Sequence, residues 1–327
     1  MGGAGKEAER KSMKQKYLFV AAMLLGLLLA GVLLTNIYVA KERGGGNAHG
    51  HSYDNVETNK QEFHILTSFY PMYIAAKNIV GDCDGVILEN LSEPQTGCMH
   101  DYQLTTEDMR RISLADAFII NGGGIESFLG DVTGQYPQLA VINASAHVQL
   151  LEDNAHVWMS IPDHMTQVRT ITDQLAGLDP SHASVYKENG KRYLDRLEEL
   201  RQSQQELAEK CKADNILIFH EAFAYVAKDY GLHVSGGMDL DEERQVSAGE
   251  AADLLAQIKE HQAGMILAEE LYGRQMCEMI QRETDVTVIY LDPCVRGEYD
   301  ADHYFITMKE NIERMKEAWS AREIQTG

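Results

Sequence analysis

Short apolar runs alternate with amphipathic helical stretches from Phe63 almost to the end of the chain. In the first half, the apolar runs cover residues 63–70, 85–91, 117–124 and 139–145. Pro71 favours a helix start and Gly81 a helix end, and Thr105 with Asp108 resembles an N-terminal cap. This alternation is typical of α/β units built around parallel strands.

The alternation is interrupted once, over residues 179–213, where no strand-like run occurs. Apolar residues recur there mostly at three- and four-residue spacings among many charged ones, which predicts one helix of roughly 30 residues and about 45 Å. Strands are expected again at 215–220, 265–270 and 286–292, with a capping box at Ser247 and Glu250 and a last helix over 304–320. A helix this long can connect two lobes as a strut.

The predicted fold class is α/β, with two lobes that each hold a mostly parallel four-stranded sheet flanked by helices, joined by one long rigid helix. The expected segments are a cytoplasmic basic segment (1–16), a membrane anchor or signal segment (17–40), a flexible tether (41–60), an N-terminal lobe (61–178), a linking helix (179–213) and a C-terminal lobe (214–327).

Residues 17–40 form an uncharged and mostly apolar run that is long enough for a helix to cross a bilayer. Five basic and two acidic side chains precede it within residues 1–16, which places the N-terminus in the cytoplasm and the body outside. A cleaved signal peptide is the alternative, but its apolar stretch is usually shorter. Tyr38 also stands where a cleavage site needs a small residue, so an uncleaved anchor is favoured.

The chain is strongly acidic, with a formal net charge of −21. Nucleic-acid binding needs a basic surface that displaces counterions, so this function class is excluded. The same charge attracts cations weakly, although it also serves solubility.

Four residues are candidates for a metal site: His100, His156, His220 and Asp292. Each follows a predicted strand or stands at its carboxyl end, where open α/β sheets collect ligands. Three imidazoles and a carboxylate form a suitable tetrahedral zinc set, with two members in each lobe, so the ion is expected in the interlobe cleft. The remaining histidines considered are read as surface residues: His64, His147, His164, His182, His233 and His261.

An exported zinc hydrolase is the main alternative from another class. His220-Glu221 begins like H-E-x-x-H, but Ala224 occupies the fifth position, so this motif fails. The five cysteines include no C-x-x-C pair and do not indicate a thiolate zinc site. We therefore expect a binding protein and no enzyme.

Several segments, in order along residues 63–320, resemble the zinc and manganese solute-binding proteins of ABC transporters. The similar segments are HDYQLTTED (100–108), NGGGIESFL (121–129) with Glu126, HVWMSIPD (156–163), HEAFAYVAKDYGL (220–232) and YLDP (290–293). Met99 departs from the family's usual proline, Ser160 replaces an aspartate, and the histidine-rich loop of many zinc-specific members is absent between Asn121 and His156.

The resemblance implies a receptor on the extracellular face of the cell membrane that passes a divalent ion to an ABC permease. Manganese-type members have a carboxylate at the position of His220, so three imidazoles favour zinc, with manganese or iron as the alternative cargo. The expected partners are the metal ion, the permease and, through the N-terminal segment, the membrane; a monomer is expected. An adhesin on the same scaffold is a further alternative.

Overall fold

The computed structural model describes residues 62–100, 102–210, 215–240 and 244–326. The proposed anchor at 17–40 and tether at 41–60 lie outside these ranges. Within the described ranges, no helix combines the length and the apolar character needed to cross a bilayer.

The first sheet is fully parallel, in the order β2-β1-β3-β4. Its strands are β1 (Phe63–Thr67), β2 (Val86–Asn90), β3 (Ala117–Ile120) and β4 (Ala140–Asn143). Its helices are α2 (Tyr70–Val80), α3 (Thr106–Leu114), α4 (Leu129–Gln135) and α5 (Ile161–Leu178). Pro71 lies in the first turn of α2, and Thr105 and Asp108 form the predicted capping box of α3.

The second sheet repeats this order as β6-β5-β7-β8, again with all strands parallel. Its strands are β5 (Asn215–Ile218), β6 (His233–Gly237), β7 (Met265–Ala268) and β8 (Thr287–Tyr290). Its helices are α7 (Phe223–Tyr230), α8 (Ala248–His261), α9 (Glu270–Glu283) and α10 (His303–Thr326). Ser247 and Glu250 make the capping box predicted for α8. The predicted fold class is thus confirmed.

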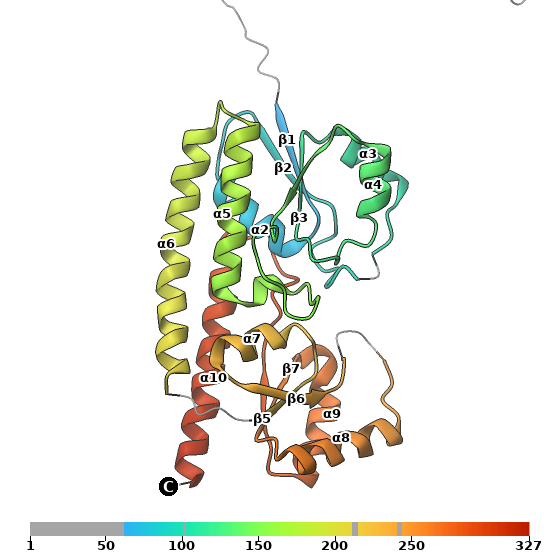
Figure 1. The fold of residues 1–327 in the computed structure, drawn as a ribbon, viewed down its shortest axis with the longest axis vertical. Coiled ribbons are helices and arrows are strands. Elements are labelled where there is room, and N and C mark those ends of the chain that lie inside the picture. The colour runs from blue at the N-terminus through green and yellow to red at the C-terminus, as the bar shows by residue number, and fades with distance from the viewer. Residues whose placement is uncertain (1–61, 101, 211–214, 241–243, 327) are drawn as a thin grey trace, which may run out of the picture. The chain divides into compact units, whose positions relative to one another are not determined.

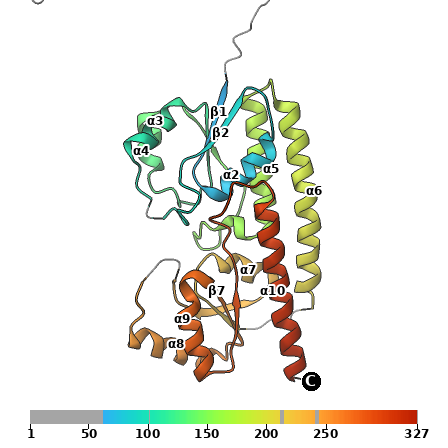
Figure 2. The same cartoon turned by 180° about the vertical axis from the view of Figure 1, so that it is seen from behind.

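The predicted strut is α6 (Ala183–Ala208), a 26-residue helix that begins later than expected. It starts after a turn in which the Asp179 carboxylate accepts hydrogen bonds from Ser181, His182 and Tyr186. Helix α6 packs on α5 and α2 at one end and contacts α7 and α10 from the second half, an arrangement visible from both sides (Figures 1 and 2). The sequence pattern did not predict α5, the helix that packs along α6.

One hydrophobic core draws on both halves of the chain. It joins residues of β1, β3 and α5 to residues of α7 and α10, including the fully buried Trp158 and Tyr304. A smaller cluster lies between the second sheet and helices α8 and α9. The halves therefore share much of their apolar interior, which stabilises one arrangement of the two sheets.

Candidate metal centre

His156 is the central residue of the candidate metal site. It precedes the short helix η1 (Val157–Met159), and no part of its side chain is exposed. Its Nδ1 lies 3.0 Å from Asn154 Oδ1, and its backbone N–H donates to the same oxygen at 2.9 Å. A neutral ring protonated at Nδ1 donates to Asn154 and leaves the Nε2 lone pair directed at the other histidines.

Burial lowers the pKa of His156 well below its usual range, and the neighbouring His220 and His100 lower it further. The ring is therefore neutral at physiological pH, which is the form that binds metals.

His220 reaches the site from the second half of the chain, two residues after the end of β5. Its side chain is 1% exposed, and its Nε2 lies 3.4 Å from Nε2 of His156. On the opposite side of the ring, Nδ1 is 3.4 Å from the buried carboxylate of Glu269, which also pairs with Arg296 at 2.7 Å. A carboxylate behind a metal-binding imidazole selects the tautomer that exposes Nε2 to the ion.

His100 supplies the exposed edge of the site, from the loop that follows β2. Its side chain is 38% exposed, and its Nε2 lies 3.4 Å from Nε2 of His156. Glu221 stands beside it, with a carboxylate oxygen 3.6 Å from His100 Nε2 and 3.3 Å from His156 Nδ1.

The donor atoms form two groups that share His156. One contains Cys98, His156 and His220, and the other contains His100, His156 and Glu221; within each, the ligand atoms lie within 4.8 Å of one another. Two nitrogen ligands about 2.0–2.1 Å from a tetrahedral zinc lie about 3.3–3.4 Å apart. The two separations between the histidine nitrogens therefore match those of a zinc site, although His100 and His220 fall in different groups.

Asp292, the fourth predicted ligand, lies in neither group of the described residues. Its Oδ1 accepts the backbone N–H of Cys294 at 2.7 Å, and its backbone exchanges hydrogen bonds with the side chain of Asn311 at 2.9 and 2.8 Å. The carboxylate thus shapes the turn after β8. The place of Asp292 near the end of β8 suggested a ligand, but it does not specify the direction of the side chain.

The prediction for His164 was wrong. This residue, assigned to the surface, lies fully buried in α5, where its ring stacks on Tyr304 with centroids 4.1 Å apart. Its Nδ1 is 3.0 Å from the Gln167 side-chain oxygen.

Cys98 and Glu221 are site residues that the sequence pattern did not identify. Each lies within two residues of a predicted ligand, as Cys98-x-His100 and His220-Glu221. That proximity is the one local signal that could have found them.

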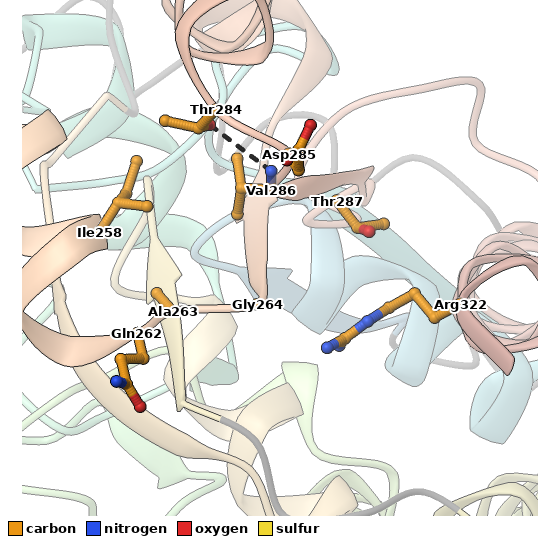
Figure 3. A pocket seen from close by; sticks show the side chains of 9 residues that line it. All are labelled: Ile258, Gln262, Ala263, Gly264, Thr284, Asp285, Val286, Thr287 and Arg322. Carbon is orange, nitrogen blue, oxygen red and sulfur yellow. Dashed lines mark hydrogen bonds between the residues drawn. The ribbon is translucent and has the colours of Figure 1, made fainter. Parts of the chain in front are cut away.

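A separate cavity of about 390 Å³ lies beside the second sheet (Figure 3). It is lined by Gly264 and Thr287, at the amino ends of β7 and β8, and by Arg322 from α10. The candidate metal site follows the carboxyl ends of strands, which is where open α/β sheets bind ligands. We assign this cavity no part in metal binding.

The fold and the convergent imidazoles define a metal-binding solute-binding protein. Among solved structures, the chain is similar to the solute-binding protein FpvC of Pseudomonas aeruginosa in complex with Mn²⁺, at 28% identity and a TM-score of 0.69. The match covers 79% of this chain and 98% of that one.

The profile of the family described as the zinc-uptake complex component A, periplasmic (ZnuA), matches residues 65–318, so the chain belongs to this family. It is 27% identical over 293 residues to the high-affinity zinc uptake system protein ZnuA of Bacillus subtilis, covering 81% of this chain and 90% of the relative. It is 26% identical over 289 residues to the zinc-binding protein AdcA of Streptococcus pyogenes, covering 77% of this chain but only 55% of AdcA. The chain thus spans about half the length of AdcA. At the level of the family, these relatives are metal-binding solute-binding proteins rather than enzymes.

Proposed function

We propose that this chain is an extracellular zinc receptor that holds its cargo with His100, His156 and His220 and delivers it to an ABC importer. The observation that carries the proposal is the pair of 3.4 Å separations that place Nε2 of His100 and of His220 around Nε2 of His156. Both separations suit two ligands of one tetrahedral ion, and they join residues from both halves of the chain.

The surroundings of the histidines support metal capture. Asn154 lies at hydrogen-bond distance from Nδ1 of His156, and the Glu269 carboxylate lies 3.4 Å from Nδ1 of His220, so both rings turn Nε2 toward the proposed ion. Because both rings are buried, an ion bound to them exchanges most of its water shell for imidazole nitrogens. His100, on the exposed edge, is placed to close the site over the bound ion.

Zinc is the proposed cargo, and manganese or iron is the alternative. Imidazole nitrogens suit zinc, whereas manganese prefers oxygen ligands. The ZnuA and AdcA relatives are named for zinc, while the FpvC structures carry Mn²⁺ or Ni²⁺. Glu221, the carboxylate beside His100, is the one exposed oxygen ligand of the two donor groups that manganese could use.

Release is proposed to need a small movement between the lobes. Several hydrogen bonds cross between the two halves near the site and oppose a wide hinge opening. They are Trp158 Nε1 to Pro293 O at 2.8 Å, Tyr304 Oη to Trp158 O at 2.7 Å, Tyr225 Oη to Asn154 O at 2.7 Å and Gly297 N to Pro94 O at 3.2 Å. Since Asn154 holds His156, a permease that strains the Tyr225 contact would disturb a ligand directly.

The extracellular location and the segments 1–16, 17–40 and 41–60 remain part of the proposal, as do the lobe boundaries 61–178, 179–213 and 214–327. The family description as a periplasmic component supports a body on the outer side of the cytoplasmic membrane. Mass spectrometry of membrane-extracted protein tests the anchor, because a mature N-terminus near Lys41 would show that the segment is removed.

Equilibrium dialysis of metal-stripped protein tests the central proposal. We expect one zinc per chain, bound tightly, and the loss of this binding in a His156→Ala variant. His147→Ala is the matched control, because His147 is an exposed histidine outside both donor groups. Absence of tight divalent-metal binding by the parent chain, or sustained hydrolysis of peptides, would contradict the receptor function.

A further inference from the structure

Cys98 points its sulfur at the two buried histidines of the site. Its Sγ lies 3.7 Å from Nε2 of His156 and 3.8 Å from Nε2 of His220. These two imidazoles are 0% and 1% exposed, and their Nε2 atoms are 3.4 Å from each other. The three donor atoms therefore form a nearly equilateral triangle made by one thiol and two buried rings.

The dimensions of this triangle suit a metal ion. A sulfur about 2.3 Å from a tetrahedral zinc and a nitrogen about 2.05 Å from it are separated by about 3.6 Å. Both sulfur–nitrogen separations exceed this value by only 0.1–0.2 Å, on the order of the ±0.2 Å tolerance used to judge metal–ligand distances.

The loop before Cys98 is packed against Arg296. Gly97 has φ +86°, a conformation that side-chain-bearing residues rarely adopt, and a Cβ at this position would lie 2.7 Å from Arg296. Arg296 in turn pairs with Glu269, the carboxylate behind His220. The loop that carries Cys98 is thus packed against the group that orients the second ring of the triangle.

We propose that Cys98 is a ligand of the transported ion, binding it as a thiolate together with His156 and His220. This inference rests on the proposed function and narrows its substrate class. A thiolate among imidazoles favours zinc and other borderline or soft cations and disfavours manganese, which prefers oxygen. Binding releases the thiol proton to water, and the thiolate's negative charge offsets part of the charge of the ion.

Cobalt(II) is the probe for this inference, because a sulfur ligand gives it an intense charge-transfer absorption in the near ultraviolet that nitrogen ligands do not give. The full chain, kept under reductant, is titrated with cobalt(II) and then with zinc as competitor. We expect one cobalt per chain with the sulfur band in the parent protein. Cys98→Ser should bind cobalt without the band. It should bind zinc more weakly by about 10–100-fold or more, since removal of an outer-shell group alone has an effect of that size.

Cys83→Ser is the matched control, because Cys83 is also half-buried but lies outside both donor groups. This variant should keep the band and the zinc affinity. A parent complex with one cobalt and no sulfur band, or a band that persists in Cys98→Ser, overturns the role of Cys98 and leaves the receptor function intact. Failure of the parent to bind any divalent ion contradicts the receptor function itself.

Alkylation of the parent protein gives a second measurement that needs no folded variant. Saturating zinc should slow iodoacetamide modification of Cys98, located by peptide mass spectrometry, and leave the rate at Cys83 unchanged. Manganese at the same concentration should protect less. Equal modification rates at Cys98 with and without bound zinc would overturn the proposal.

Discussion

The two sheets have the same strand order, but the residues that follow their central strands, β1 and β5, have different roles. In the first half, Ser68 follows β1 and donates to the buried Glu126, which follows β3, at 2.8 Å. In the second half, His220 follows β5 and faces the buried Glu269, which follows β7, at 3.4 Å. Each half therefore sets a buried carboxylate behind a polar residue just after its central strand, although Ser68 is the first residue after β1 and His220 the second after β5.

The side chain that faces the carboxylate determines whether the arrangement can bind a metal. The hydroxyl of Ser68 has no second ligating atom, and Glu126 also accepts the backbone N–H groups of Asn121 and Gly122, at 2.7 and 3.1 Å. This first arrangement satisfies its own polar groups and stabilises the lobe. The imidazole of His220 has a second nitrogen on the far side of the ring, so the second arrangement can both face a carboxylate and bind a metal.

The largest effect is expected from His220→Ala, compared with Ser68→Ala. Loss of the imidazole removes a buried ligand, so zinc affinity should fall by more than the roughly 10–100-fold that outer-shell changes cost. Ser68→Ala should leave zinc affinity near the parent value and lower stability instead. Calorimetric zinc titration and urea unfolding of both variants separate the two outcomes.

His220→Glu sharpens the same comparison by exchanging ligand chemistry. It replaces a nitrogen by an oxygen ligand, so the preference for zinc over manganese should decrease. Titration of the parent and the variant with both metals measures the ratio. Zinc affinity unchanged in both His220 variants would show that the two halves do not share the ion.

Much of this comparison was accessible from the sequence before the structure. The alternation of apolar runs predicted seven of the eight strands, and the capping boxes at Thr105 and Ser247 were placed correctly, because these signals are local. Strand β6 was missed because its segment, HVSGG, contains two glycines and little apolar side chain. Helix α5 was not predicted, although its buried apolar residues recur at three- and four-residue spacings.

The site was predictable only in part, for a related reason. The structure brings His100, His156 and His220 together, as expected for residues near the carboxyl ends of parallel strands. Side-chain direction is set by tertiary contacts, which hold the Asp292 carboxylate in its own turn. They also bury His164 against Tyr304, where a surface position was predicted. Cys98 and Glu221 carry no spacing signal of their own.

The second prediction compares the two buried carboxylates. Glu269→Gln keeps the size of the side chain but removes the charge behind His220, so zinc affinity should fall roughly 10–100-fold. Glu126→Gln should leave zinc affinity unchanged and reduce stability by about 1–3 kcal/mol, because a buried amide replaces an acceptor of three hydrogen bonds. Equal zinc affinities for the two variants would remove the functional difference between the halves.

The third prediction concerns the pH dependence of the metal-free protein and uses one titratable group from each half, His164 and Asp229, neither of which belongs to a donor group. Burial lowers the pKa of His164 to about 4, so the stability that its neutral form contributes is lost as pH falls from about 6.5 toward 4. Burial raises the pKa of Asp229 to about 6, so the stability contributed by its protonated form is lost as pH rises from about 3.8 through 6.

His164→Phe keeps the stacking on Tyr304 and removes the titration. The loss of unfolding free energy between about pH 7 and pH 5 should therefore shrink by about 2 kcal/mol relative to the parent, with the His156 contribution common to both proteins. Asp229→Asn should instead reduce the decrease in unfolding free energy that occurs as pH rises from about 4 to 6. Urea unfolding across this range measures both, and parallel curves for parent and His164→Phe would contradict the assignment.

The smallest effect is expected at Asp292, in the turn that follows the last strand of the second half. Asp292→Ala removes the acceptor for the Cys294 N–H, so the free energy of unfolding should fall by about 0.5–1.5 kcal/mol. Zinc affinity should change by less than roughly tenfold, because the carboxylate belongs to neither donor group. Asp292→Asn is the matched control, since its amide oxygen can still accept the Cys294 N–H, and it should recover most of the lost stability. A zinc affinity lowered more than tenfold in both variants, with Asp292→Asn as stable as the parent, would return this carboxylate to the ligand set and show that the turn after β8 opens when the ion binds.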